Sequence, residues 1–163
     1  MPNWKNAKDA DDPKLLDFIS WEARLLNAYK KSLVQTRDLE TKIRPRKRAT
    51  NVFKLCAYRY YNDLMKAGAI DKLRQHVEQR DGNKWKGRGN EPEQWIVRLV
   101  SDRDQTNTRT KRRSRTTAEM RLARINKVRP DALLGFLYEA GSTDMIEKAA
   151  ASNKVFAWAS AYQ

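Results

Sequence analysis

Four clusters of lysine and arginine lie in the middle of this chain, and basic side chains at such close spacing are suited to holding phosphate groups. Each cation that contacts a phosphate releases a condensed counterion, and arginine can clamp a phosphate through two parallel hydrogen bonds. The first two clusters are Lys42, Arg44, Arg46, Lys47 and Arg48, and then Lys84, Lys86 and Arg88. The other two are Arg109, Lys111, Arg112, Arg113 and Arg115, and then Arg121, Arg124 and Lys127. We interpret all of them as candidate nucleic-acid-binding residues; the alternative is a solvated charge run that binds nothing.

Trp85 is the aromatic residue best placed to take part in such binding. It stands between Lys84 and Lys86 in a glycine-rich segment, residues 81–92, which predicts a loop. An exposed indole among cations can stack on an unpaired base, which is worth about 1–3 kcal/mol. The alternative is that the indole folds back onto the core. The segment is not a phosphate-binding P-loop, because no Gly-Lys-Ser/Thr sequence follows its glycines.

Residues for catalysis or metal binding are few. His76 is the single histidine and Cys56 the single cysteine, which excludes a thiolate–imidazole zinc site. We predict His76 to be a surface or half-buried helical residue and Cys56 a small buried apolar one. Asp102, Asp104 and Glu119 could hold Mg²⁺ for phosphodiester cleavage, but charge balancing is their ordinary explanation. We therefore predict no enzyme, no catalytic residue, no metal site and no cofactor.

The positive charge is concentrated in the central part of the chain. Residues 41–130 contain 25 Lys and Arg against 9 Asp and Glu. Residues 1–40 contain 7 of each sign, and residues 131–163 contain 2 basic and 4 acidic residues. A surplus confined to one region indicates a binding surface for a polyanion, of which nucleic acid is the commonest in a cell.

The spacing of apolar residues predicts helices throughout, with no run typical of a strand. We expect an all-α fold, a single helical domain over residues 1–163 with about six or seven helices and basic loops. Apolar residues at 40% of the chain are enough for a core. Residues 1–12 are expected to form a loose tail. Residues 101–115 contain no apolar side chain, so we expect a mobile basic segment there.

Individual helices are predicted from their apolar stripes and from proline and glycine. The first covers residues 13–41, the second runs from Thr50 or Asn51 to Gly68, the third starts at Asp71 and the fourth starts at Pro92. The later ones cover residues 116–128, 131–140 and the segment from Thr143, which Ser152-Asn153 may split. In the second helix the predicted core residues are Phe53, Ala57, Tyr60, Tyr61 and Leu64, whereas Tyr58 is predicted to be exposed.

These patterns favour a non-catalytic nucleic-acid-binding protein, a regulator or a structural subunit of a nucleoprotein assembly. RNA or single-stranded nucleic acid is favoured over duplex DNA, because glycine-rich and polar basic segments suit unpaired strands. The alternative is an inhibitor or adaptor of a nucleic-acid enzyme, which would dock its basic face on an acidic protein surface.

Other partners and the cellular setting follow from the ends of the chain and from its apolar content. The N-terminal helix and the aromatic C-terminal segment are candidate contacts for a protein partner or a second copy. No run of apolar residues approaches the roughly 18 that a membrane span needs. Residues 1–14 lack the apolar run that is typical of a secretory signal. We expect no membrane contact and an intracellular setting, cytoplasmic or nucleoid-associated, or a place in a virion.

Overall fold

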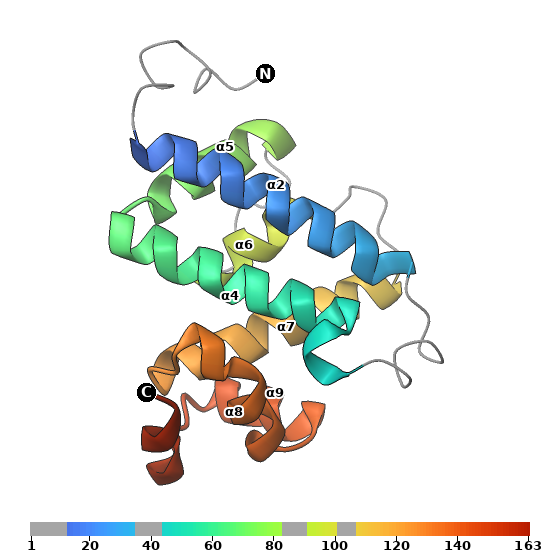
Figure 1. The fold of residues 1–163 in the computed structure, drawn as a ribbon, viewed down its shortest axis with the longest axis vertical. Coiled ribbons are helices and arrows are strands. Elements are labelled where there is room, and N and C mark those ends of the chain that lie inside the picture. The colour runs from blue at the N-terminus through green and yellow to red at the C-terminus, as the bar shows by residue number, and fades with distance from the viewer. Residues whose placement is uncertain (1–12, 35–43, 83–90, 101–106) are drawn as a thin grey trace.

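The computed structural model describes residues 13–34, 44–82, 91–100 and 107–163. These residues form seven α-helices and three short 3-10 helices and contain no strand, which confirms the predicted all-α fold. The α-helices are α2 (Pro13–Val34), α4 (Ala49–Ala67), α5 (Ile70–Asp81), α6 (Pro92–Val100), α7 (Asn107–Ile125), α8 (Leu133–Ala140) and α9 (Thr143–Ala151). The 3-10 helices are η2 (Pro45–Lys47), η4 (Pro130–Ala132) and η5 (Ala157–Tyr162). Figure 1 shows their arrangement.

Proline, glycine and serine set several of the helix boundaries. Pro92 opens α6, where the missing amide hydrogen has no intrahelical partner to lose. Gly68 ends α4 with a left-handed φ of 63°, a conformation that glycine adopts without steric cost. Ser142 caps α9, since its hydroxyl accepts a hydrogen bond from the Met145 amide at 3.4 Å. These boundaries agree with those predicted from the sequence.

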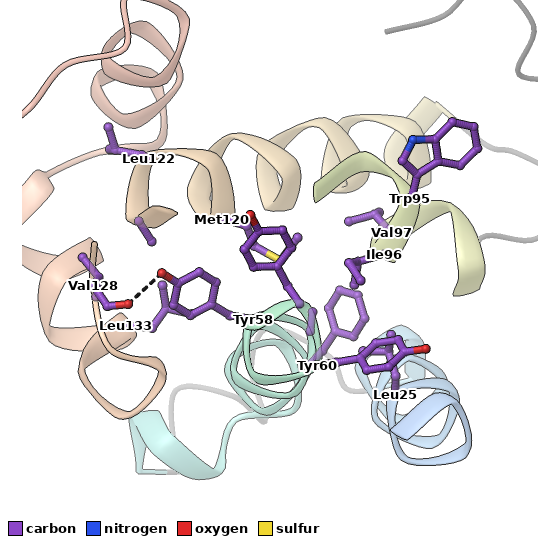
Figure 2. Close-up of a cluster of buried hydrophobic side chains, with 14 of the residues drawn as sticks. Leu25, Tyr58, Tyr60, Trp95, Ile96, Val97, Met120, Leu122, Val128 and Leu133 are labelled. Atoms are coloured by element: carbon purple, nitrogen blue, oxygen red, sulfur yellow. Dashed lines mark hydrogen bonds between the residues drawn. The ribbon is translucent and has the colours of Figure 1, made fainter. Parts of the chain in front are cut away.

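The core is built around α4, which packs against α2, α5, α6, α7 and α8. The buried face of α4 includes Phe53, Ala57, Tyr60, Tyr61 and Leu64, as the apolar stripe in the sequence predicted. Figure 2 shows Tyr60 near Leu25 of α2, and Ile96 and Val97 of α6 on the side of α4 toward α7. One continuous apolar cluster contains residues from each of the seven described α-helices. The described helices therefore form one body.

Tyr58 is an exception to the predicted pattern, because it is 1% exposed rather than on the surface. Its hydroxyl donates a 2.7 Å hydrogen bond to the backbone carbonyl of Val128, which follows α7 (Figure 2). Burial raises the pKa of the Tyr58 hydroxyl well above its ordinary value. The bond supplies the polar partner that a buried tyrosine needs, so this ring adds to the contact between α4 and the C-terminal helices.

Replacing Tyr58 with phenylalanine is expected to lower the free energy of unfolding by about 1–2 kcal/mol, because the buried Val128 carbonyl loses its donor. Tyr61→Phe is the matched control. The Tyr61 hydroxyl is also buried but has no hydrogen-bond partner among the described residues, so its removal is expected to be neutral or slightly stabilising. Urea denaturation of both variants measures the difference. Equal losses of stability would contradict this role for Tyr58.

The directions of the central helices decide which side chains meet. The Tyr29 and Phe53 rings lie 5.3 Å apart. Glu22, about two turns before Tyr29 on α2, lies close enough to Tyr60 for its charge to raise the pKa of the Tyr60 hydroxyl. Residue numbers therefore fall along α2 as they rise along α4, and the two helices are antiparallel. Lys54 of α4 pairs with Glu119 of α7 at 2.9 Å, whereas Tyr58 reaches the residues after α7. The helices α4 and α7 thus run in the same direction.

Helix α7 begins at Asn107, nine residues before the predicted start at Thr116. The basic residues Arg109, Lys111, Arg112, Arg113 and Arg115 thus belong to a helix that continues into the core at Met120. The sequence prediction placed them in a mobile segment because none of them can be buried favourably. The predicted helix start at Thr116 is wrong, because residues 107–115 already belong to α7. Residues 101–106 lie outside the described part of the chain.

The C-terminal aromatic residues pack on α8. The rings of Phe156, Trp158 and Tyr162 all lie within 6.3 Å, centroid to centroid, of the buried Phe136 ring. Tyr162 sits directly against α8, where a Cβ on Gly135 would come within 3.0 Å of its ring. The aromatic segment that the sequence offered as a partner contact therefore stabilises the fold itself.

Candidate nucleic-acid interface

Three helical segments that are far apart in sequence meet at one end of the bundle. Because α2 is antiparallel to α4 and α7 is parallel to it, the C-terminal half of α2 and the beginnings of α4 and α7 lie on the same side (Figure 1). We call the residues 23–34, 44–54 and 107–118 the basic end. They contain thirteen Lys and Arg and no Asp or Glu. The fold therefore joins the first and third predicted clusters into one cationic region.

The first cluster contributes exposed cations to the basic end. Arg44, Arg46 and Lys47 are exposed in and beside η2, immediately before α4. Arg48 is the half-buried residue that precedes the first turn of α4. No carboxylate of the described residues lies within ion-pair distance of Arg44, Arg46 or Lys47. Their charge is thus directed at solvent, where a ligand can reach it.

The third cluster adds the first half of α7. Arg115 is exposed, and within the described ranges its guanidinium makes no ion pair. The structure places Arg109, Lys111, Arg112 and Arg113 in the two turns before it. The positive end of the helix dipole of α7 lies at the same side, so it adds to the potential that the side chains create.

Two lysines of α2 were missed by the sequence reading. Lys30 and Lys31 are exposed in the last turns of α2, opposite the start of α4. They lie in the N-terminal region whose charges cancel, so the charge count gave no sign of them. Adjacent lysines near the end of an amphipathic helix were the available signal, but only the antiparallel packing of α2 on α4 brings them to the basic end.

The basic end is bounded by a buried ion pair. Lys54 donates a 2.9 Å hydrogen bond to Glu119, whose side chain is 6% exposed. Burial raises the pKa of the Glu119 carboxyl, and Lys54 and Arg115 act in the opposite direction. Glu147 of α9 lies close enough to reinforce the rise. Lys54 is therefore engaged by the fold, whereas Arg44, Arg46 and Lys47, which precede α4, make no ion pair within the described residues.

The fourth predicted cluster has a different environment. Arg124 donates to Glu93 at 3.0 Å and lies 3.5 Å from Glu91, both at the start of α6. Arg121 donates to Asn153 at 2.9 Å and lies 3.8 Å from Glu91. The sequence predicted an outward, ligand-facing row here. The guanidinium groups instead join α7 to the start of α6 and to Asn153, which follows α9, and of this cluster only Lys127 is exposed.

Glu93 is the fully buried member of this network, with a side chain that is 0% exposed. Burial lowers the pKa of Arg124, but the Glu93 carboxylate more than reverses this, so the net direction is upward. Glu93→Ala is expected to lower the free energy of unfolding by about 2 kcal/mol. This is less than a fully buried pair would lose, because 36% of the Arg124 side chain remains exposed.

Glu91→Ala is the matched control for Glu93→Ala, because Glu91 contacts the same arginine from the surface. Its side chain is 37% exposed and its ion-pair distances are 3.5 and 3.8 Å. Its loss is expected to cost no more than about 0.5 kcal/mol. Thermal or urea unfolding compares the two variants, and equal destabilisation would show that burial of Glu93 contributes nothing.

The remaining predicted residues lie outside the described part of the chain. They are Lys42 of the first cluster and the loop residues Lys84, Trp85, Lys86 and Arg88. The ends of the loop segment are nevertheless held by the described helices. Before it, Arg80 donates to the backbone carbonyls of Arg98 and Leu99; after it, Glu91 meets α7.

The single histidine and the single cysteine lie wholly or partly inside the packed helices. His76 is buried, contrary to the prediction, and its Nε2 lies 3.3 Å from Oε1 of Glu22, so it joins α5 to α2. Cys56 is half-buried, and burial raises the pKa of its thiol, which disfavours the reactive thiolate. No three His, Cys, Asp or Glu side chains of the described residues gather to hold a metal ion. Asp102 and Asp104 lie outside this part of the chain.

None of the helices described here is both long and apolar enough to cross a membrane. A scan against protein-family models and searches of curated proteins and of solved structures found no match to this chain, so we argue its function from its own residues.

Proposed function

We propose that this protein binds nucleic acid through the basic end and acts, without catalysis, as a regulator or structural subunit of a nucleoprotein assembly. The observation that carries the proposal is the gathering of thirteen Lys and Arg and no carboxylate-bearing residue in three segments on one side of the bundle. Elsewhere on the described helices several arginines pair with acidic residues, namely Arg74, Arg80, Arg121 and Arg124. This region, in which Arg44, Arg46, Lys47 and Arg115 are exposed and make no ion pair within the described ranges, is suited to a polyanion.

Salt dependence distinguishes direct binding to phosphates from other contacts. Each neutralised phosphate contributes about 0.7 to the slope of log affinity against log salt for a single strand, and about 0.9 for a duplex. The exposed cations Arg44, Arg46, Lys47 and Arg115, together with Lys30 and Lys31, offer several simultaneous contacts. We therefore expect a slope that corresponds to about four or more phosphates.

The test is fluorescence anisotropy of nuclease-treated, full-length protein with a labelled 20-nucleotide RNA, the equivalent single-stranded DNA and the duplex DNA, each over a salt series. Tight binding at low salt with a steep slope supports the proposal. Absence of binding to all three at low salt overturns it. In that case co-purification of a protein partner after nuclease treatment would favour the alternative, an adaptor that docks its basic face on an acidic protein surface.

The proposed preference for RNA or an unpaired strand depends on Trp85. Trp85→Ala is expected to weaken single-strand binding by about tenfold, the equivalent of one lost stacking contact, and to affect duplex binding much less. The anisotropy series above measures both. An equal change for the two ligands would remove the basis for preferring an unpaired strand, while leaving phosphate binding by the basic end intact.

A further inference from the structure

The first two turns of α7 have a composition that does not favour a helix. Between Asn107 and Thr117 there is no apolar residue, so these turns cannot be held by burial of an apolar face. The packed part of the helix begins further on, where Thr116 and Met120 are each 1% exposed. Some other interaction must therefore stabilise residues 107–113 as a helix.

The charges within these turns oppose helix formation. Arg109 and Arg113, and likewise Lys111 and Arg115, are four residues apart, a spacing at which like charges on a helix repel each other. The first turn contains no acidic residue, although the positive end of the helix dipole favours one there. The first acidic residue along α7 is Glu119, which is already paired with Lys54.

The neighbouring segments increase this repulsion. The beginning of α4, which Arg44, Arg46 and Lys47 directly precede, lies at the same end of the bundle as the start of α7 (Figure 1), and the basic end contains no acidic residue. Bound anions would reverse each of the unfavourable contributions: they would screen the pairs of like charges, occupy the positive end of the helix dipole and neutralise the other cations of the basic end.

We propose that a polyphosphate strand stabilises the first two turns of α7, so that binding at the basic end and helix formation over residues 107–113 are coupled. This inference rests on the proposed function, because the strand is the ligand of the same region. It also reconciles a sequence that predicts mobility in the free protein with a structure in which these residues are helical. Affinity is then reduced by the fraction of the free protein that lacks these turns.

Hydrogen exchange of the full chain, followed by mass spectrometry, measures the coupling. Exchange of amides in residues 107–113 is compared with and without a saturating 20-nucleotide single-stranded DNA at about 50 mM salt, and binding is confirmed by anisotropy in the same samples. We expect exchange over 107–113 to slow by about tenfold on binding. Residues 133–140 of α8 are the internal reference and are expected to change little, since α8 lies outside the basic end.

Two outcomes separate this inference from the proposed function. If the strand binds but exchange over 107–113 is unchanged, the coupling is wrong and the nucleic-acid-binding function stands. If no strand binds, the function is wrong and the coupling has no ligand. A uniform slowing that includes 133–140 to the same extent also overturns the coupling, because it would reflect general stabilisation of the fold by the ligand.

A pair of variants at Arg109 tests the physical cause. Arg109→Glu introduces an acid into the first turn and an opposite charge four residues before Arg113. In the free protein it is expected to slow exchange over 107–113 by a factor of about three or more and to reduce the further change on binding. Arg109→Gln removes the repulsion without adding the acid, so its effect should be smaller. Exchange as fast as in the original chain for both variants would show that charge does not limit this helix.

Discussion

Replacing Arg46, Lys47 and Arg115 together with alanine is expected to weaken oligonucleotide binding by about 10–100-fold near 0.1 M salt. The three side chains are exposed, belong to two segments of the basic end and make no ion pair within the described ranges. If each contacts one phosphate, the slope of log affinity against log salt should fall by about 2 for a single strand. The loss should be similar for all base sequences, because phosphate contacts carry no sequence information.

The control for this triple variant removes the same total charge elsewhere. Arg59, Lys66 and Lys148 are also exposed, and they lie outside the three segments of the basic end. Their replacement with alanine is expected to change affinity by less than about threefold, through the general field of the protein alone. Anisotropy over a salt series compares the two triple variants. Equal losses would show that net charge, and not the gathering of cations at one end, accounts for binding.

Phe136→Ala is expected to lower the free energy of unfolding by about 3–5 kcal/mol, the largest effect on stability that we foresee for a single substitution. The side chain is 0% exposed, and the rings of Phe156, Trp158 and Tyr162 all surround it. Removing it leaves a cavity among rigid rings that cannot close around the smaller residue. The C-terminal helices would lose their common centre.

Tyr138→Ala, two residues along the same helix, is the control for Phe136→Ala. Tyr138 is 90% exposed, so its truncation is expected to change stability by no more than about 0.5 kcal/mol. Both variants keep the helix-forming character of α8, because alanine is the best helix former. Urea denaturation followed by far-ultraviolet circular dichroism compares them, and a loss below about 1 kcal/mol for Phe136→Ala would contradict its central role.

Much of the fold was predictable because local signals determine it. Pro92 and Gly68 mark helix ends through restrictions on their own backbone, and the stripe that includes Phe53 and Leu64 identifies the buried face of α4. The burial of Tyr58 and His76 was predicted wrongly, because the polar group of each can be buried only with a partner that is distant in the sequence. The Val128 carbonyl and the Glu22 carboxylate cannot be assigned to them from spacing along the chain.

The beginning of α7 was missed for a different reason. The spacing of Thr116 and Glu119 matches a helix-capping motif, and nothing apolar precedes it, so the sequence indicates a start at that point. In the structure Thr116 is buried inside the helix and Glu119 pairs with Lys54 of α4. Glu119, whose spacing from Thr116 resembled a helix cap, therefore pairs with another helix instead of capping its own.

The candidate interface was predictable as a set of residues and not as a surface. Counting charges identified Arg46 and Arg115, but only the directions of α4 and α7 bring them to one end. The same count could not separate them from Arg124, which the buried Glu93 neutralises. Whether an arginine is available to a ligand depends on acidic residues about thirty positions away, and a single sequence carries no sign of such pairings.

The length of α7 has a practical consequence for how the protein can be handled. Its nineteen residues extend about 28 Å, from the basic end to the C-terminal helices. Near its far end the last residues of the chain are fastened, since the Arg129 amide donates to the Tyr162 carbonyl at 2.8 Å and Gln163 donates to the Asn126 carbonyl at 3.2 Å. A tether or fluorophore attached at Gln163 would therefore stand well clear of an incoming strand, which makes this residue a suitable anchor for surface immobilisation.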